Sequence, residues 1–176
     1  MSYFQNQILI SMPHLNDPIF GRSIVYICSH NHEGAMGLII NKDIHYEGLK
    51  KLYREIKIQD DFIEKTFHPI YYGGPVTLER AFLLHSSDVL VGGSLEICKN
   101  IALSSDIKIL DLIKDKIGPQ HVKLFLGYAG WTEGQLEGEI ENGDWLFQDA
   151  DTDFIFTDDY EGKWSELLKN FHVISS

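Results

Sequence analysis

Residues 123–145, KLFLGYAGWTEGQLEGEIENGDW, carry the pattern that says most about the fold. They overlap an almost wholly apolar segment, residues 122–126, of the kind that forms a central strand covered on both faces. The small residues of the following segment, residues 127–131, predict a tight break in the backbone. A helix is expected after this break, so the stretch predicts a strand, a glycine-rich turn and a helix.

The predicted helix has signals at both of its ends. Thr132 and Gln135 have the spacing of a capping box, in which side chains satisfy free N–H groups at the start of a helix. Leu136 and Ile140 lie one turn apart on the side that we expect to be buried. Gly143 can end the helix in the left-handed conformation.

The turn before this helix is a candidate ligand site. In α/β proteins, free backbone N–H groups and the helix dipole point toward such a turn. Trp131 adds a large flat surface that would suit a partner. The alternative is that the glycines only make the turn and Trp131 only packs, since no phosphate-binding fingerprint accompanies them.

Strand-like and helix-like segments alternate along the rest of the chain. Amphipathic helices are predicted over residues 46–56, over residues 105–117 with Ser105 as the cap, and after Asp158 and Glu161 at the end of the chain. A short connection predicts that residues 23–30 and 35–41 pair antiparallel. The predicted strands are residues 7–11, 23–30, 35–41, 81–85, 94–98, 101–103, 145–147 and 154–156, and residues 70–72 lead into a rigid turn at residues 73–75.

These elements predict an α/β fold, with α+β as the alternative. We expect one domain over residues 1–176, built on a mixed sheet of about six or more strands with helices packed on it. No apolar run approaches the roughly 18 residues of a membrane helix, and the N-terminal segment lacks the basic residues of a secretory signal. A cytoplasmic protein that does not engage membranes is therefore expected, with Cys28 and Cys98 as reduced core thiols.

The charge of the chain is strongly acidic and unevenly distributed. The net charge is −11, and the residues from 121 onward hold twelve acids and only three bases. A protein without a basic face is a poor ligand for the phosphates of DNA or RNA, so no direct contact with nucleic acid is expected. The acidic half can serve solubility or attract a basic partner.

Motifs for the common enzymatic chemistries are absent. The sequence has no P-loop, no dinucleotide-binding fingerprint, no nucleophile elbow and no zincin motif. His30 and His32 are separated by one residue, so on a strand their side chains would face the same way and could bind zinc, but no third ligand is evident. The favoured interpretation is that both histidines are turn residues that bond backbone groups. His85 and Ser86 are adjacent and would point to opposite faces of a strand. We therefore expect neither a metal nor a cofactor.

Three long segments resemble the YqgE/AlgH family of bacterial proteins. In chain order they are LISMPHLNDPIFGRSIVYICSHNHEGAMGLIINK (residues 9–42), YYGGPVTLERAFLLHS (residues 71–86) and LFLGYAGWTEGQLEGEIENGDWL (residues 124–146). The resemblance implies a compact mixed α/β domain. It brings no established catalytic residues, and some members of the family are described as transcriptional regulators.

The residues that match the family signature concentrate in loops and at strand ends, where binding residues are frequent. We expect the following of them to converge on one loop-lined groove: Asp17, His30, Asn41, Gly74, His85, Gly127, Gly130, Trp131 and Gln135.

Three functions remain open at this point. The favoured one is a binding or regulatory module that holds a protein or small-molecule partner in this groove and acts on transcription, if at all, indirectly. The alternative is a hydrolase or transferase that uses His30, His85 or Asp17. The third is a direct DNA-binding regulator, which the acidic charge disfavours.

Overall fold

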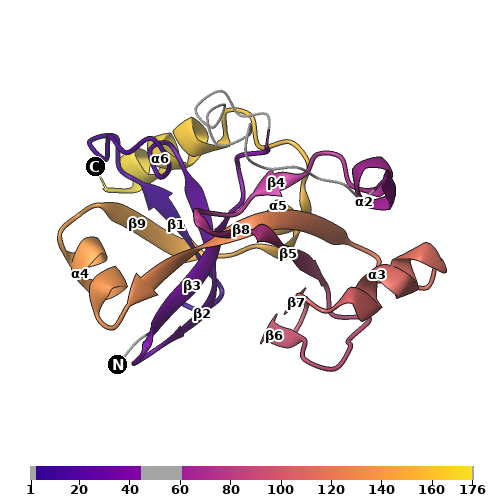
Figure 1. Ribbon diagram of the computed structural model, residues 1–176. Helices are drawn as coiled ribbons and strands as arrows, with labels where there is room; N and C mark the ends of the chain where they lie inside the picture. Colours follow the sequence, from indigo (N-terminus) through magenta and orange to yellow (C-terminus); the bar gives the residue numbers. More distant parts are fainter. Residues whose placement is uncertain (1–2, 45–60, 176) are drawn as a thin grey trace.

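Nine strands form one sheet in the part of the protein that the computed structural model describes, residues 3–44 and 61–175 (Figure 1). The strand order is β6-β7-β5-β8-β3-β2-β1-β9, with β4 also paired to β8. All pairs are antiparallel except β4 with β8. The predicted mixed sheet is therefore confirmed. The strands are β1 (Gln7–Ser11), β2 (Ile24–Asn31), β3 (Gly34–Ile39), β4 (Tyr71–Tyr72), β5 (Val76–Ser86), β6 (Leu95–Cys98), β7 (Ile101–Ser104), β8 (Val122–Thr132) and β9 (Trp145–Asp149).

Helices pack on both faces of the sheet. Side chains of α5 and α6 join the buried cluster on one face, and those of α2, α3 and α4 join clusters on the other. The helix predicted over residues 46–56 lies outside the described residues. The described helices are α2 (Asp61–Thr66), α3 (Ile107–Lys114), α4 (Gln135–Glu141), α5 (Thr152–Phe156) and α6 (Lys163–Ser175).

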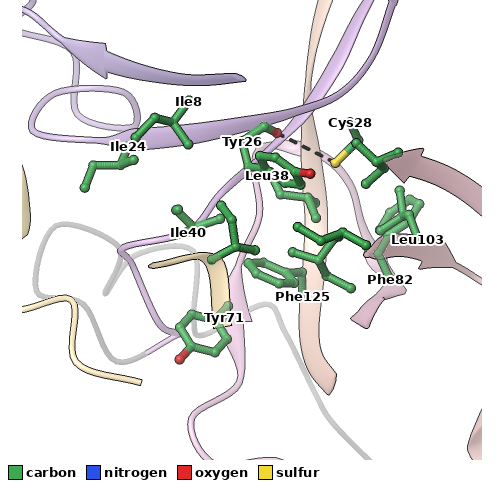
Figure 2. Close-up of a cluster of buried hydrophobic side chains, with 14 of the residues drawn as sticks. Ile8, Ile24, Tyr26, Cys28, Leu38, Ile40, Tyr71, Phe82, Leu103 and Phe125 are labelled. Atoms are coloured by element: carbon green, nitrogen blue, oxygen red, sulfur yellow. Dashed lines mark hydrogen bonds between the residues drawn. The ribbon is translucent and has the colours of Figure 1, made fainter. Parts of the chain in front are cut away.

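The central strands are covered on both faces, which explains their continuous apolar sequences. In β2, Tyr26 and Cys28 belong to one buried cluster, drawn in Figure 2, while Val25 and Ile27 belong to the cluster on the opposite face. This is the pattern of a sheet between two layers, in which successive side chains must all be apolar. Both cysteines are free thiols, and burial raises the pKa of Cys28.

The break predicted over residues 127–131 is wrong, because β8 continues through them to Thr132. Gly127 has a φ of 73°, and the pairing of β5 with β8 shifts register at this level. A Cβ atom on Gly127 would lie 2.2 Å from the carbonyl oxygen of Gly74. The glycines therefore permit a kink and a close crossing of two backbone segments within a strand. Beyond the kink, β8 leaves β5 and pairs with β3.

Helix α4 begins later than its capping signal predicts. Its N-cap is Gly134, which has a φ of 74°. The Gln135 side chain does reach back, and its Oε1 accepts a hydrogen bond from the Thr132 N–H at 3.0 Å. Leu136 is fully buried, and Gly143 ends the helix with a φ of 82°, as expected. Thr132 and Gln135 thus interact as their spacing predicts, but their hydrogen bond closes a tight turn before the helix.

Two further expectations are corrected. Residues 154–156 form part of helix α5, not a strand, because Asp151 caps this segment and accepts a hydrogen bond from the Asp153 N–H at 3.3 Å. Helix α3 is capped by Asp106, whose carboxylate accepts from the Lys108 N–H at 2.9 Å, and not by Ser105. Ile117 lies beyond this helix and is 61% exposed.

Candidate functional site

Helix α4 is held against the sheet by the carboxylate of Glu139. One of its oxygens accepts hydrogen bonds from the indole N–H groups of Trp131 and Trp145, both at 3.1 Å. The other accepts a hydrogen bond from the Gln135 amide at 2.9 Å. Trp131 is 7% exposed and packs edge-on against Trp145 at 6.4 Å between ring centroids. Trp131 is therefore a largely buried residue with a satisfied polar edge, and it also lines part of a groove on the sheet face.

His30 makes a second attachment to α4. Its Nδ1 accepts a hydrogen bond from the Phe4 N–H at 2.9 Å, so the proton is on Nε2, which donates to Glu137 Oε1 at 2.7 Å. His30 is buried, whereas His32 is exposed and lies 3.9 Å from Glu33. Residues 3–44 and 61–175 contain no group of three or more metal-binding side chains. His30 lies in strand β2 and bonds one backbone N–H group and Glu137, and only His32 lies in the turn, so the interpretation of both histidines as turn residues is wrong for His30.

A shallow groove of about 610 Å³ lies on the sheet face opposite α4. It lies at the end of the sheet where the β2–β3 hairpin and the last residues of β8 extend beyond the pairing of β8 with β5. Figure 1 shows the course of these strands. The apolar side chains that line it include those of Met36, Phe82 and Tyr128. Gly130 is exposed in the groove, and we refer to this hollow as the sheet-face groove.

His85 takes part in a buried chain of hydrogen bonds. Its Nδ1 lies 2.9 Å from the Ser86 carbonyl oxygen, so Nδ1 carries the proton and Nε2 accepts from the Ser104 hydroxyl at 2.8 Å. Ser104 lies 2.7 Å from the hydroxyl of Ser94, which accepts from the Val91 N–H at 3.1 Å. His85 is fully buried, and burial lowers its pKa. The chain ties β5 and β7 to the turn that precedes β6.

Asp17 and Asn41 organise the loop between β1 and β2. One Asp17 carboxylate oxygen accepts from two backbone N–H groups of the following turn, at 2.7 and 3.0 Å. Asn41 bridges the Ile24 N–H and the Arg22 carbonyl group at 2.8 and 2.9 Å. The Lys42 ammonium group is buried beneath this loop and donates to two of its carbonyl oxygens. Burial lowers the pKa of Lys42 to about 8, opposed by the charge of Asp17.

Lys123 is a second buried lysine that the sequence analysis did not single out. Its ammonium group donates to the Thr157 carbonyl oxygen and to the Tyr160 hydroxyl, and lies over the rings of Tyr71 and Tyr160 at 4.8 and 4.2 Å. Burial lowers the pKa of Lys123 to about 7, opposed by the charge of Asp158. A lone lysine in an apolar strand was the only available sequence signal.

The nine predicted site residues are distributed over several places. His30, Trp131 and Gln135 surround α4, and Gly130 lies in the sheet-face groove. Gly74 and Gly127 make the backbone crossing, Asp17 and Asn41 support the β1–β2 loop, and His85 belongs to its own buried chain. The structure thus places the nine residues in several separate groups, the largest of which is the group at α4.

The chain has known relatives along nearly its whole length. The model of the AlgH-like family matches residues 8–175. A "UPF0301 protein" of Hahella chejuensis is 41% identical over 180 residues, which cover 100% of this chain and 95% of the relative. Another from Marinomonas sp. is 42% identical over 153 residues, 87% of this chain and 81% of the relative.

Solved structures have the same fold. The solution structure of the AlgH protein from Pseudomonas aeruginosa is 35% identical, with a TM-score of 0.75, and the match covers 94% of this chain and 87% of that one. A crystal structure of a protein from Corynebacterium diphtheriae matches with a TM-score of 0.74 at 19% identity, over 97% of this chain and 88% of that one. The second comparison concerns the fold alone.

The sheet, its two helical layers and the glycine-mediated crossing define a mixed α/β domain with an exposed groove on one face. With the matched family model and these relatives, the chain belongs to the AlgH-like family. No helix among the described residues has the length and apolar character needed to span a bilayer.

Proposed function

We propose that this protein is a binding module that holds a short extended peptide of a partner protein in the sheet-face groove. Any regulatory effect on transcription would then be indirect, exerted through that partner. The observation that carries this proposal is the groove itself, in which side chains of four strands surround the exposed backbone at Gly130. We expect this binding to occur in the cytoplasm, where both free thiols would remain reduced.

The form of the groove favours a peptide over a small molecule. Small-molecule sites are concave and cover most of the ligand surface, whereas this groove is shallow and open along its length. Phe82 and Tyr128 meet edge to face at 5.7 Å and provide an apolar wall. Arg80 lies over Phe82 at 5.1 Å, and Glu33 lies on the hairpin side. Apolar contacts flanked by charges of both signs suit a peptide with mixed side chains.

The strand edge beside the groove supplies backbone hydrogen-bonding groups. The pairing of β5 with β8 ends at Val76 and Tyr128, and β8 continues for four residues paired only with β3 among the described residues. An extended peptide can add to such an edge through main-chain hydrogen bonds while the groove receives alternate side chains. The combination of a free edge and an adjoining groove thus supports an extended ligand.

Selection from a random peptide library displayed on phage tests the proposal. Gly130→Val is the blocking variant, because a Cβ at this position would meet only the Tyr128 ring at 3.5 Å and Val76 at 3.9 Å. The fold should therefore tolerate it while the groove is filled. Gly138→Val on the exposed surface of α4 is the matched control, since no atom lies within 4 Å of a Cβ there.

We expect selected peptides to bind the Gly130→Val variant at least about tenfold more weakly than the parent protein, and the Gly138→Val variant with unchanged affinity. Equal affinity for both variants, or the failure of the library to yield any peptide, would contradict the proposal.

A further inference from the structure

A second hollow lies between two parts of the chain. One part is the start of α6 with the residues before it, and the other comprises the residues after β3 and those at β4. It encloses about 470 Å³, is more enclosed than the sheet-face groove, and shares none of its lining residues. Residues 158–162 and Trp164 form one side, and Asn41, Asp43 and Tyr71 form the other. We call this hollow the acidic pocket.

The charge around this pocket is predominantly negative. Among the described residues, its lining includes Asp43, Asp158, Asp159 and Glu161 and one positively charged side chain, that of Arg22. The Arg22 guanidinium group lies over the Trp164 ring at 4.8 Å, so it is held at the wall of the pocket. Residues 158–162 of this lining belong to the acidic part of the sequence after residue 121, whereas Arg22 and Asp43 come from the first part. An acidic cluster alone can be a solvated surface, so a separate sign of a ligand is required.

The Tyr71 hydroxyl provides that separate sign. Tyr71 is 3% exposed, and its hydroxyl oxygen has no hydrogen-bond partner among the described residues. A buried polar group without a partner is costly, so such groups normally indicate a missing ligand or water. The ring stacks on Phe125 at 5.1 Å, and the hydroxyl points away from the buried cluster (Figure 2). Tyr71, Asp43 and Asp158 line the same pocket; burial raises the pKa of Tyr71, and the charges of Asp158 and Asp43 raise it further.

The faces of the two tyrosine rings are already used by the protein itself. Lys123 lies over both Tyr71 and Tyr160, with Tyr160 donating its own hydroxyl proton to the Ile155 carbonyl oxygen at 2.5 Å. A ligand would therefore meet the edge of Tyr71 and the carboxylates, not an empty aromatic cage. These are hydrogen-bond acceptors, and they select a ligand with several N–H donors and a positive charge.

We propose that the acidic pocket binds an organic cation through a primary ammonium or guanidinium group, which donates hydrogen bonds to the Tyr71 hydroxyl and to the carboxylates of Asp158 and Asp159. A pocket of this volume is large enough for an amine of several carbons. A free polyamine and a lysine or arginine side chain of a basic peptide share this chemistry.

Calorimetric titration of the full-length protein at about 0.15 M salt tests this site. The probes are spermidine and agmatine as small amines, an arginine-rich octapeptide as the peptide source, and 1,4-butanediol as an uncharged control. Tyr71→Phe removes only the hydroxyl group. The Asp158→Asn/Asp159→Asn double variant removes two charges, and Asp111→Asn/Glu141→Gln removes two exposed charges elsewhere.

We expect a cationic probe to bind with a dissociation constant below about 1 mM, and both pocket variants to weaken it by about tenfold or more. The Asp111→Asn/Glu141→Gln control should keep the parent affinity, and butanediol should not bind. Small amines that bind identify a diffusible ligand, whereas binding of the octapeptide alone identifies a basic peptide; both support the site.

Three results would overturn the proposal: no binding of any cationic probe up to about 5 mM, equal weakening in the control variant, or unchanged affinity in Tyr71→Phe. The Tyr71→Phe result decides the matter if the double aspartate variant does not fold, which its melting temperature will show.

Discussion

The attachment of α4 through Glu139 allows a quantitative prediction. In Glu139→Ala, the indole N–H groups of Trp131 and Trp145 and the Gln135 amide lose their shared acceptor. The two tryptophans are almost fully buried, so water cannot easily replace the carboxylate. Each buried donor left without a partner costs about 1–3 kcal/mol.

The better helix propensity of alanine offsets only a few tenths of a kcal/mol. We therefore expect Glu139→Ala to lower the free energy of unfolding by roughly 2–4 kcal/mol. In a chain of this length that corresponds to a fall in melting temperature of about 5–12 °C. Urea denaturation followed by tryptophan fluorescence and far-UV circular dichroism measures the change.

Glu141→Ala on the same helix is the control, because this side chain is exposed and should change stability by less than about 0.5 kcal/mol. Glu139→Gln keeps one acceptor oxygen without the charge and should lose about half as much as the alanine variant. A double-mutant cycle with Trp145→Phe should show a coupling above about 0.5 kcal/mol. If Glu139→Ala is no less stable than Glu141→Ala, the assignment of the carboxylate as the anchor of α4 is refuted.

Three further outcomes are expected. The folded-state pKa of Lys123, about 7, lies below its unfolded value of 10.5, so the unfolded chain binds more protons between these values and stability should rise with pH above about 7. Lys123→Met should flatten this rise between pH 7 and 8.5 in denaturation curves, and an unchanged slope would argue against a depressed pKa. Gly127→Ala should destabilise the protein by more than about 2 kcal/mol through strain and collision with the crossing backbone, while Gly138→Ala should stabilise it by up to about 1 kcal/mol; equal melting temperatures would contradict this contrast. The protein should not bind a promoter-length duplex specifically at about 0.15 M salt, and sub-micromolar, sequence-dependent binding in a fluorescence titration would overturn that expectation.

The sequence by itself determined most of the strands and the general class of fold. Apolar, β-branched runs such as residues 7–11 and 23–30 favour strands that are covered on both faces, and in the structure they bury side chains on both faces of the sheet. The prediction that Gly143 ends α4 in the left-handed conformation is also confirmed, because it depends only on the backbone freedom of glycine. The chain's acidic balance, which bears on its partners, is likewise a property of the sequence alone.

Only the tertiary structure decided what the glycines and the polar residues do. A Gly-rich segment can make a turn or a kink, and the contact of Gly127 with Gly74, far apart in sequence, selects the kink. Trp131 packs and Gln135 bonds to Glu139 because α4 folds back onto β8, which no local pattern encodes. The partners of His30, His85 and Lys123 are similarly distant in the chain. Hydrogen-bond partners and pockets depend on which distant segments come into contact, whereas the sequence pattern predicts only the local secondary structure and the buried side of each segment.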